Sequence, residues 1–272
     1  MDYDMKQLQS VQLELLDELM RVCRDNDIPL YVAAGSCIGA VRHQGFIPWD
    51  DDIDVFMYAD DVDRLFACRD QFGSSFFLQD HTTDPGYTNA IARLRKRGTA
   101  CVERDDADMK CHHGIFLDIY LLYYYPANKV LRAKMFADAV LHTMLLAGHP
   151  PLNHGRAVAA AGRVMLLPYK NEKKRREKIR RLEKELRKYR DTDDLVIMYG
   201  MDISLKRIIS YKTAWFQKPA QAMFEGRQVP VATDAHAYLT RRYGDYMKLP
   251  PEDKRHSYHS YVFVSFDREY NA

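Results

Sequence analysis

Hydrophobic residues near the start of the chain recur at helical spacing. Five of them lie three or four positions apart: Leu8, Val11, Leu15, Leu19 and Val22. This spacing places them on one face and predicts an amphipathic helix. Asp27 and Pro29 follow, so we expect the helix to end near Asn26.

Apolar runs and helical periodicity predict the other elements of the chain. Strands are expected at 31–34, 76–78, 87–94 and 114–122, and helices at 60–72, 128–167, 172–190 and 233–243. The long helical stretch is broken near 148–151, where glycine and proline lie together.

The composition is that of a globular protein. Hydrophobic residues make up 47% and charged residues 29% of the 272 residues, a length that suits one large domain or two small ones. The formal net charge is +2, so composition gives no strong attraction to nucleic acid, and we expect no nucleic-acid partner.

The cysteine pattern and the first residues favour a cytoplasmic protein. Five cysteines are an odd number and include no Cys-x-x-Cys pair, which suggests reduced thiols. The first residues lack the basic start and apolar core of a signal peptide, and uncharged apolar runs stay below the roughly 18 residues that span a bilayer. We therefore expect a cytoplasmic location, with contact at the inner face of the membrane left open.

Residues 172–190 form a strongly basic segment with eleven Lys or Arg against four Glu. An apolar stripe runs through this charge and predicts a helix: Ile179, Leu182, Leu186 and Tyr189. The basic side chains are explained by a solvated helix face or by contact with an anionic membrane or polymer.

The strongest candidate chemistry lies in residues 35–55, where a predicted strand carries Asp52 and Asp54. Successive strand residues point to opposite faces, so these two carboxylates share one face. Mutually repelling carboxylates are stable together when a proton or a cation joins them, and oxygen ligands favour Mg²⁺ or Mn²⁺. The alternative is an acidic loop with solvated side chains. A calcium loop of the EF-hand type is disfavoured, because Val55 and Asp61 stand where that loop needs Gly and Glu.

Other residues add candidate phosphate contacts. Gly35 and Ser36 follow a short predicted strand and open a helix, an arrangement that presents backbone N–H groups to an anion. Arg93 and Arg95 share one side of a predicted strand. Two arginines placed in this way can bind a phosphate or a carboxylate, and equally they can lie on a strand edge exposed to solvent.

Asp118 interrupts the apolar run 114–122 and is a natural third carboxylate for a metal held by Asp52 and Asp54. A structural role at a strand end is the alternative. Cys111, His112 and His113 precede it without zinc-finger spacing, so zinc is disfavoured. Histidines 256 and 259 could serve as general bases or be exposed, and the sequence does not assign roles to these two or to histidines 112 and 113.

Several of these stretches resemble one family. Residues 39–54, Gly-Ala-Val-Arg-His-Gln-Gly-Phe-Ile-Pro-Trp-Asp-Asp-Asp-Ile-Asp, closely resemble the LicD family of phosphotransferases, which is related to fukutin-related proteins. Residues 114–119 resemble its second acidic strand. Phe224-Glu-Gly, Val229-Pro and Tyr243-Gly-Asp-Tyr-Met-Lys-Leu-Pro-Pro resemble its C-terminal motifs.

The resemblance implies an α/β (α+β) fold, with a nucleotidyltransferase-like mixed sheet core at 1–125 and a mostly helical region at 126–272, as two domains or one continuous domain. It also implies transfer of a phosphorylated alcohol, phosphocholine from CDP-choline as the first choice, onto a cell-surface glycan or glycolipid with release of CMP. Mapped onto this chain, Asp52, Asp54 and Asp118 would bind Mg²⁺ (or Mn²⁺) and carry the catalysis. The donor phosphates would be held by the residues at four positions: Gly35, Ser36, Arg42 and Arg95.

Two rival functions remain at this point. A true nucleotidyltransferase would move a nucleoside monophosphate and release pyrophosphate, using the same Gly-Ser and Asp-x-Asp geometry. A binding module with a degenerate site would hold a glycan or nucleotide without turnover, although the presence of all three acids argues against degeneration.

Overall fold

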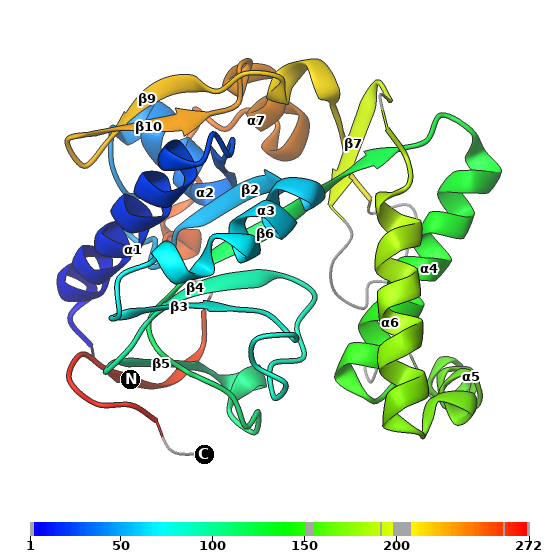
Figure 1. The fold of residues 1–272 in the computed structure, drawn as a ribbon. Coiled ribbons are helices and arrows are strands. Elements are labelled where there is room, and N and C mark those ends of the chain that lie inside the picture. The colour runs from blue at the N-terminus through cyan, green and yellow to red at the C-terminus, as the bar shows by residue number, and fades with distance from the viewer. Residues whose placement is uncertain (1–2, 151–154, 191, 198–207, 258, 271–272) are drawn as a thin grey trace.

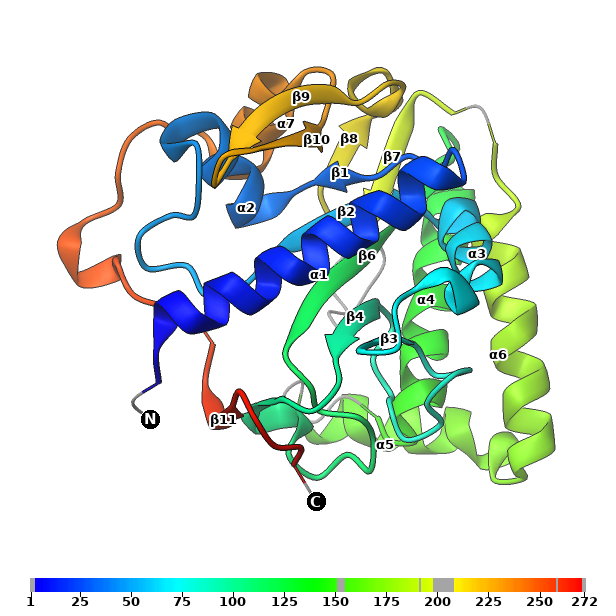
Figure 2. The ribbon, with the colours of Figure 1, turned by 60° about the vertical axis from the view of Figure 1, so that its left-hand side comes forward.

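The computed structural model describes residues 3–150, 155–190, 192–197, 208–257 and 259–270. The fold is a mixed α/β fold, in which a twisted sheet is covered by helices and a group of three helices stands to one side (Figures 1 and 2). The larger helices are α1 (Met5–Asp25), α2 (Ala34–Ile38), α3 (Ala59–Ala67), α4 (Lys129–Ala147), α5 (Arg156–Leu166), α6 (Glu172–Arg187) and α7 (Ala235–Tyr243). Short 3-10 or π turns are Gly39–His43, Arg69–Gln71, Arg104–Asp106, Leu167–Tyr169, Thr213–Phe216 and Glu252–Lys254.

The central sheet has seven strands and is built around the long strand β6. Its strands are β1 (Tyr31–Val32), β2 (Asp54–Tyr58), β3 (Phe76–Gln79), β4 (Ala92–Lys96), β6 (Phe116–Tyr125), β7 (Asp194–Ile197) and β8 (Ser210–Lys212). Strand β2 runs parallel to β6 along one edge. Along the other edge, β4 pairs antiparallel with the first part of β6 and β7 pairs antiparallel with its last part. Because β6 is an apolar run buried on both faces, the core lies along it.

Helix α1 covers one face of this sheet, as its apolar spacing predicts. Its N-terminus is capped by the Asp4 carboxylate, which accepts from the N–H groups of Lys6 and Gln7. The buried face holds Leu8, Leu15, Leu19 and Val22 of the predicted stripe, whereas Val11 is partly buried. The helix ends at Asp25, one residue before Asn26.

Helices α4, α5 and α6 form the group beside the sheet, shown in green to yellow-green in Figure 1. They share a small second core of Leu145, Leu146, Ile179 and Leu182. Gly148 ends α4 in the left-handed conformation (φ +74°), close to the break predicted from the sequence.

The last part of the chain adds strands that sequence patterns did not predict. Strands β9 (Ala220–Phe224) and β10 (Arg227–Val231) form a hairpin, and β11 (Tyr261–Ser265) pairs with β5 (Ala100–Glu103). The hairpin turn needs positive φ at Glu225 (+48°) and Gly226 (+76°), which explains the Glu-Gly pair in this motif.

The hairpin tip packs on the loop that leads to the acidic residues. The Glu225 carboxylate accepts from the N–H of Phe46 (3.1 Å), and the rings of Phe46 and Phe224 lie 4.8 Å apart. A Cβ at Gly45 would lie 2.2 Å from Glu225 Oε1, so a side chain at this position would displace the carboxylate. Two motifs separated by about 180 positions in the sequence therefore form one packed unit.

The strand predicted at 87–94 is shifted. Strand β4 begins at Ala92, because Tyr87 closes a turn in which its N–H donates to the carbonyl of Asp84 (2.9 Å). A division of the chain near residue 125 stays a prediction. Strands β7 and β8 extend the central sheet from beyond that position, and β11 pairs with β5 from before it.

Candidate functional site

Two of the predicted aspartates lie side by side on adjacent strands. Asp54 of β2 and Asp118 of β6 are register partners in a parallel pair, so both side chains project from the same face of the sheet. Both are buried, with 9% and 5% of their surface exposed. The sheet thus holds the two carboxylates together.

Asp52 lies just before strand β2 and not on it, contrary to the prediction of one strand carrying both acids. Helix α1 holds this stretch outside the ladder, because the side-chain amides of Gln9 and Gln12 donate to the carbonyls of Asp50 (2.9 Å) and Asp51 (2.7 Å). Burial raises the pKa of Asp52 to about 6, against the lowering effect of His259, and the nearby charge of Asp118 adds to the rise. Asp52 therefore lies close to Asp118, although it reaches that position from a loop.

The acidic residues form a cluster in which the negative charges of neighbouring carboxylates repel one another. Burial raises the pKa of Asp54, and the charges of Asp52 and Asp118 raise it further. The pKa of Asp50 rises to about 8 by burial and by the charge of Asp52. Within the described residues, Asp54 Oδ1 and Asp50 Oδ2 are buried without a hydrogen-bond partner.

Oxygen donors of this kind fit a hard divalent cation. Several buried carboxylates at one point need protons or a cation to offset their repulsion, and Mg²⁺ or Mn²⁺ prefers such oxygens. The unpartnered oxygen of Asp54 is the kind of buried acceptor that a cation would satisfy. The donor set at the site is thus compatible with the predicted metal.

Asp51 and His259 lie beside the acidic cluster and are hydrogen-bonded to each other. The sequence analysis did not predict this contact. His259 Nδ1 donates to Asp51 Oδ1 (2.8 Å), and its Nε2 lies 3.8 Å from Asp52 Oδ2. Asp51 also accepts from the hydroxyls of Tyr3 (2.7 Å) and Ser257 (2.5 Å). Ligand atoms of Asp51, Asp52 and His259 lie within 4.8 Å of one another, so this group could also contribute to a metal site.

The charge of His259 follows from its neighbours. Burial acts to lower its pKa, but the hydrogen bond with Asp51 and the charges of Asp52 and Asp51 outweigh burial and raise the pKa to about 9. His259 therefore supplies a positive charge beside the aspartates at neutral pH. The sequence signal was weak, because an exposed histidine and a site histidine look alike without their partners.

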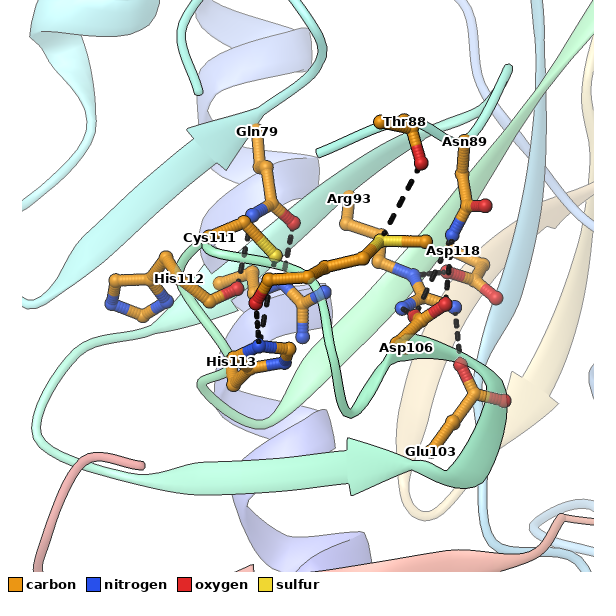
Figure 3. Close-up of polar contacts among 12 residues, drawn as sticks. Gln79, Thr88, Asn89, Arg93, Glu103, Asp106, Cys111, His112, His113 and Asp118 are labelled. Atoms are coloured by element: carbon orange, nitrogen blue, oxygen red, sulfur yellow. Dashed lines mark hydrogen bonds and ion pairs between the residues drawn. The ribbon is translucent and has the colours of Figure 1, made fainter. Parts of the chain in front are cut away.

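Arg93 binds three carboxylates at once, as Figure 3 shows. Its Nε donates to Asp118 Oδ1 (2.6 Å), and its two terminal nitrogens donate to Asp106 (2.8 Å) and Glu103 (2.6 Å). The guanidinium also lies over the ring of Phe116, 3.9 Å from its centre. Arg93 is therefore a carboxylate-binding residue, one of the alternatives that the sequence left open, and it fixes one oxygen of Asp118.

Comparison with known proteins gives two kinds of similarity. A family model described as the nucleotidyltransferase domain of LicD, FKTN and FKRP matches residues 27–137. The lipopolysaccharide cholinephosphotransferase LicD of Haemophilus influenzae is 27% identical over 266 residues, which cover 94% of this chain and 96% of that protein. Two shorter matches are each 38% identical. An uncharacterized protein of Rickettsia prowazekii matches over 59 residues, which are 22% of each chain. An uncharacterized protein of Rickettsia typhi matches over 50 residues, which are 18% of this chain and 16% of that protein.

Residues 27–137 therefore form a LicD-type nucleotidyltransferase domain. The residues matched by the LicD domain contain Asp52, Asp54 and Asp118 of the acidic cluster. His259 and the β9–β10 hairpin lie beyond them, within the part of the chain that the structure adds to the site.

Two of the LicD-like positions, Gly35 and Ser36, lie in the short helix α2 beside the acids. Ser36 is buried, and its Oγ accepts from the N–H of Asp54 (3.0 Å), which ties α2 to the start of β2. A Cβ at Gly35 would lie 2.8 Å from Asp50 Oδ2, so glycine lets this carboxylate pack against the helix. Both residues shape the acidic cluster, and their contact with donor phosphates stays a prediction.

The two predicted arginines of the LicD pattern have different surroundings. Arg42 is partly buried, and its guanidinium donates to the carbonyl of Tyr246 and to His43 Nδ1 (3.4 Å). Arg95 is fully buried; it donates to Gln79 Oε1 (2.5 Å) and to the carbonyl of Gly114 (2.8 Å). Its guanidinium thus supports the fold and has no exposed surface with which to meet a ligand.

Arg242 of helix α7 is a cation near the acids that the sequence analysis missed. Its charge is near enough to lower the pKa of Asp54 against the effects that raise it. Its guanidinium donates to the hydroxyls of Tyr211 (2.7 Å) and Tyr243 (2.9 Å), which fix its direction. The available signal was its place directly before the LicD-like block that begins at Tyr243.

The neighbouring histidines 112 and 113 are held by backbone groups. Nδ1 of His112 accepts from the N–H of Gly114 (3.1 Å), and Nε2 of His113 bonds to the carbonyl of Met109 (2.8 Å; Figure 3). Burial lowers the pKa of His112 to about 4, so its ring is neutral near pH 7. These contacts are those of structural histidines.

Proposed function

We propose that this chain transfers a phosphorylated alcohol, phosphocholine in the first instance, from a CDP-alcohol to a hydroxyl of a cell-surface glycan or glycolipid. The similarity that supports the acceptor class is the Haemophilus influenzae relative, whose name states cholinephosphotransfer to lipopolysaccharide. CDP-choline as donor, CMP as product and dependence on Mg²⁺ (or Mn²⁺) are parts of the same proposal.

The convergence of Asp52, Asp54 and Asp118 is the observation that carries the proposal. Their mutual repulsion makes the cluster unfavourable unless it has a function that needs it. These three residues would hold the divalent cation. A bound cation would neutralise charge on the transferring phosphoryl group and on the departing CMP.

The chain's own cations would orient the donor. Arg242 is held by two tyrosine hydroxyls, its charge acts on Asp54, and it would bind a donor phosphate there. Ser36 would add its hydroxyl hydrogen, because its oxygen already accepts from Asp54. Arg42 remains a proposed contact at the edge of the site, and we leave out Arg95 because of its complete burial.

The reaction we propose is an in-line displacement. The acceptor oxygen forms a bond to the phosphorus that carries the alcohol, the bond from this phosphorus to the CMP oxygen breaks, and the acceptor loses its proton. Asp118 could take that proton on the carboxylate oxygen that Arg93 does not hold.

A product screen tests this function. Purified protein would be mixed with CDP-choline, CDP-ethanolamine, CDP-glycerol or CDP-ribitol, with Mg²⁺ or with a chelator, and CMP would be measured. We expect Mg²⁺-dependent CMP release from one CDP-alcohol, fastest with CDP-choline. Pyrophosphate release from a nucleoside triphosphate would instead identify a nucleotidyltransferase, and nucleotide binding without turnover would identify a binding module.

Matched variants separate phosphate binding from folding. Arg242→Gln should raise the KM for the CDP-alcohol at least about tenfold, since a charge-assisted hydrogen bond is lost. Arg241→Gln, on the exposed side of the same helix, is the control and should leave KM unchanged. Equal KM values for both variants would remove Arg242 from the donor site.

A cytoplasmic location also remains a proposal. In the described part of the chain, the structure contains no helix that combines the length and the apolar character needed to cross a membrane.

A further inference from the structure

The basic segment and helix α5 together form an unusual surface at the edge of the helical group. Residues 156–190 contain fourteen Lys or Arg and four Glu, a formal charge of +10, whereas the whole chain carries +2. The rest of the chain is therefore net acidic, and the positive charge is concentrated in one hairpin of helices. Figures 1 and 2 place α5 at the end of the α4–α6 pair that lies away from β7.

Helix α6 presents its basic residues on the side opposite its packed stripe. Ile179 and Leu182 are buried with leucines of α4, and Leu186 is buried in the main core, which fixes the orientation of the helix. The opposite side is exposed and carries five cations, with Glu177 among them: Lys173, Arg180, Arg181, Lys184 and Lys188. The sequence left open a solvated helix face or contact with an anionic membrane or polymer. A solvated face alone does not explain the exposed apolar side chains of the neighbouring helix α5.

Helix α5 exposes apolar side chains beside this charge. The helix packs inward through Gly162, where an added Cβ would meet Pro150 at 2.6 Å, and Leu166 joins the small second core. Val164, Met165 and Leu167 face outward, with 64%, 47% and 54% of their surface exposed. Consecutive exposed apolar residues of this size mark an interaction surface more often than a solvated one.

We infer that α5, the turn after it and the basic side of α6 form a docking surface for an anionic lipid bilayer. Arg156 and Arg163 precede the exposed apolar residues of α5, and Lys170 and Lys173 lie three and six positions after Leu167. Apolar side chains next to lysines and arginines suit the boundary between acyl chains and anionic headgroups. A second copy of the chain is disfavoured, because a symmetric contact through this surface would oppose two segments of charge +10. This inference stands apart from the proposed activity.

Vesicle binding by the full chain tests the inference. The protein would be sedimented with vesicles of phosphatidylcholine alone or of phosphatidylcholine with phosphatidylglycerol, over a range of salt. We expect binding to the anionic vesicles, weak binding to the neutral ones, and a decrease with salt. Equal binding to both vesicle types, or none to either, would overturn the inference.

Two surface variants separate the basic and the apolar contributions. Lys173→Gln/Arg180→Gln/Lys184→Gln should weaken partitioning to anionic vesicles at least about tenfold, and Val164→Ser/Leu167→Ser about fivefold. The matched controls remove the same number of charges or apolar groups elsewhere: Lys6→Gln/Arg24→Gln/Arg69→Gln and Val130→Ser/Met223→Ser. All these side chains are at least partly exposed, so circular dichroism should show folded proteins.

The outcomes identify the kind of partner. Loss in the charge variant but none in the Val164→Ser/Leu167→Ser variant would point to a soluble polyanion, and equal loss in the controls would show unspecific adsorption; either result contradicts bilayer docking. The same assay on Asp54→Asn keeps the inference separate from the proposed activity, because that variant should bind vesicles like the wild type.

Discussion

Asp54 and Asp118 are register partners on the parallel strands β2 and β6, so backbone hydrogen bonding holds two carboxylates side by side. Adjacent strands lie about 4.8 Å apart, a spacing at which two buried negative charges repel strongly. The fold keeps this arrangement and adds Asp52 from a neighbouring loop. Repulsion in this cluster should lower the stability of the metal-free protein, and this can be measured.

Asp54→Asn should make the metal-free protein more stable and inactive. The amide removes one buried charge, so the free energy of unfolding should rise by about 1 kcal/mol at pH 7, while CMP release should stop. Thermal unfolding with and without Mg²⁺ checks this, since Mg²⁺ should stabilise the wild type and not the variant. The exposed Asp105→Asn is the control. Retained turnover in both Asp52→Asn and Asp54→Asn would remove the metal centre.

Arg93→Ala should destabilise the protein by about 3–5 kcal/mol. Its removal leaves Glu103, Asp106 and Asp118 without their shared cation in a buried position. Urea unfolding measures the loss. Arg93→Lys keeps the charge but cannot make three directed bonds, so it should recover part of the stability. Full stability in Arg93→Ala would show that the three acids are solvated or protonated.

His259→Ala should lower turnover and weaken the response to Mg²⁺. The variant loses the partner that orients Asp51 and faces Asp52, so we expect about 10–100-fold more Mg²⁺ for half-maximal activity. The exposed neighbour His256→Ala is the matched control. An unchanged Mg²⁺ titration in His259→Ala would place His259 outside the metal environment.

The free energy of unfolding should decrease in weak acid because of the buried side chain of His112. Burial holds its folded pKa at about 4, below the ordinary value of 6.5, so the unfolded chain binds the proton first as pH falls. This contribution is intact above about pH 6.5 and decreases by up to about 3 kcal/mol as pH falls toward 4. His112→Asn keeps an acceptor for the N–H of Gly114 and does not titrate. Unfolding at about pH 7.5 and about pH 4.5 should show a smaller pH effect in this variant than in the wild type.

Gly45→Ala should displace the hairpin that packs on the acidic loop. The new methyl group would meet Glu225 Oε1 at 2.2 Å, which breaks the bond from Phe46 N–H and should cost about 1–3 kcal/mol. Gly73→Ala, whose methyl group would meet its nearest neighbour at 3.4 Å, should be close to neutral. Equal unfolding free energies for the two variants would contradict this packing role.

Sequence periodicity predicted the elements that depend on their own side chains. Helix α1 and strand β6 have long apolar patterns, and the structure contains both close to the expected bounds. Strands β7, β8 and β11 are short and depend on pairing with strands from other parts of the chain, a condition that is absent from local sequence.

The candidate site also contains residues that local sequence predicted and contacts that it did not. Asp54 and Asp118 were predictable as a pair, because acids in apolar strands are conspicuous. The partners of Arg93 and of His259 were not, since they depend on contacts between segments that are far apart in the chain. Arg95 resembles a ligand-binding arginine by its spacing, whereas the structure shows its side chain fully buried.

The contact between His259 and Asp51 joins positions 208 residues apart. A ribosome makes the chain from its N-terminus, so the aspartates emerge long before their histidine. The positive charge beside Asp51 and Asp52 is therefore added only after the segment around His259 has been made. Assembly of the full acidic site thereby depends on the synthesis of a segment far along the chain from the aspartates.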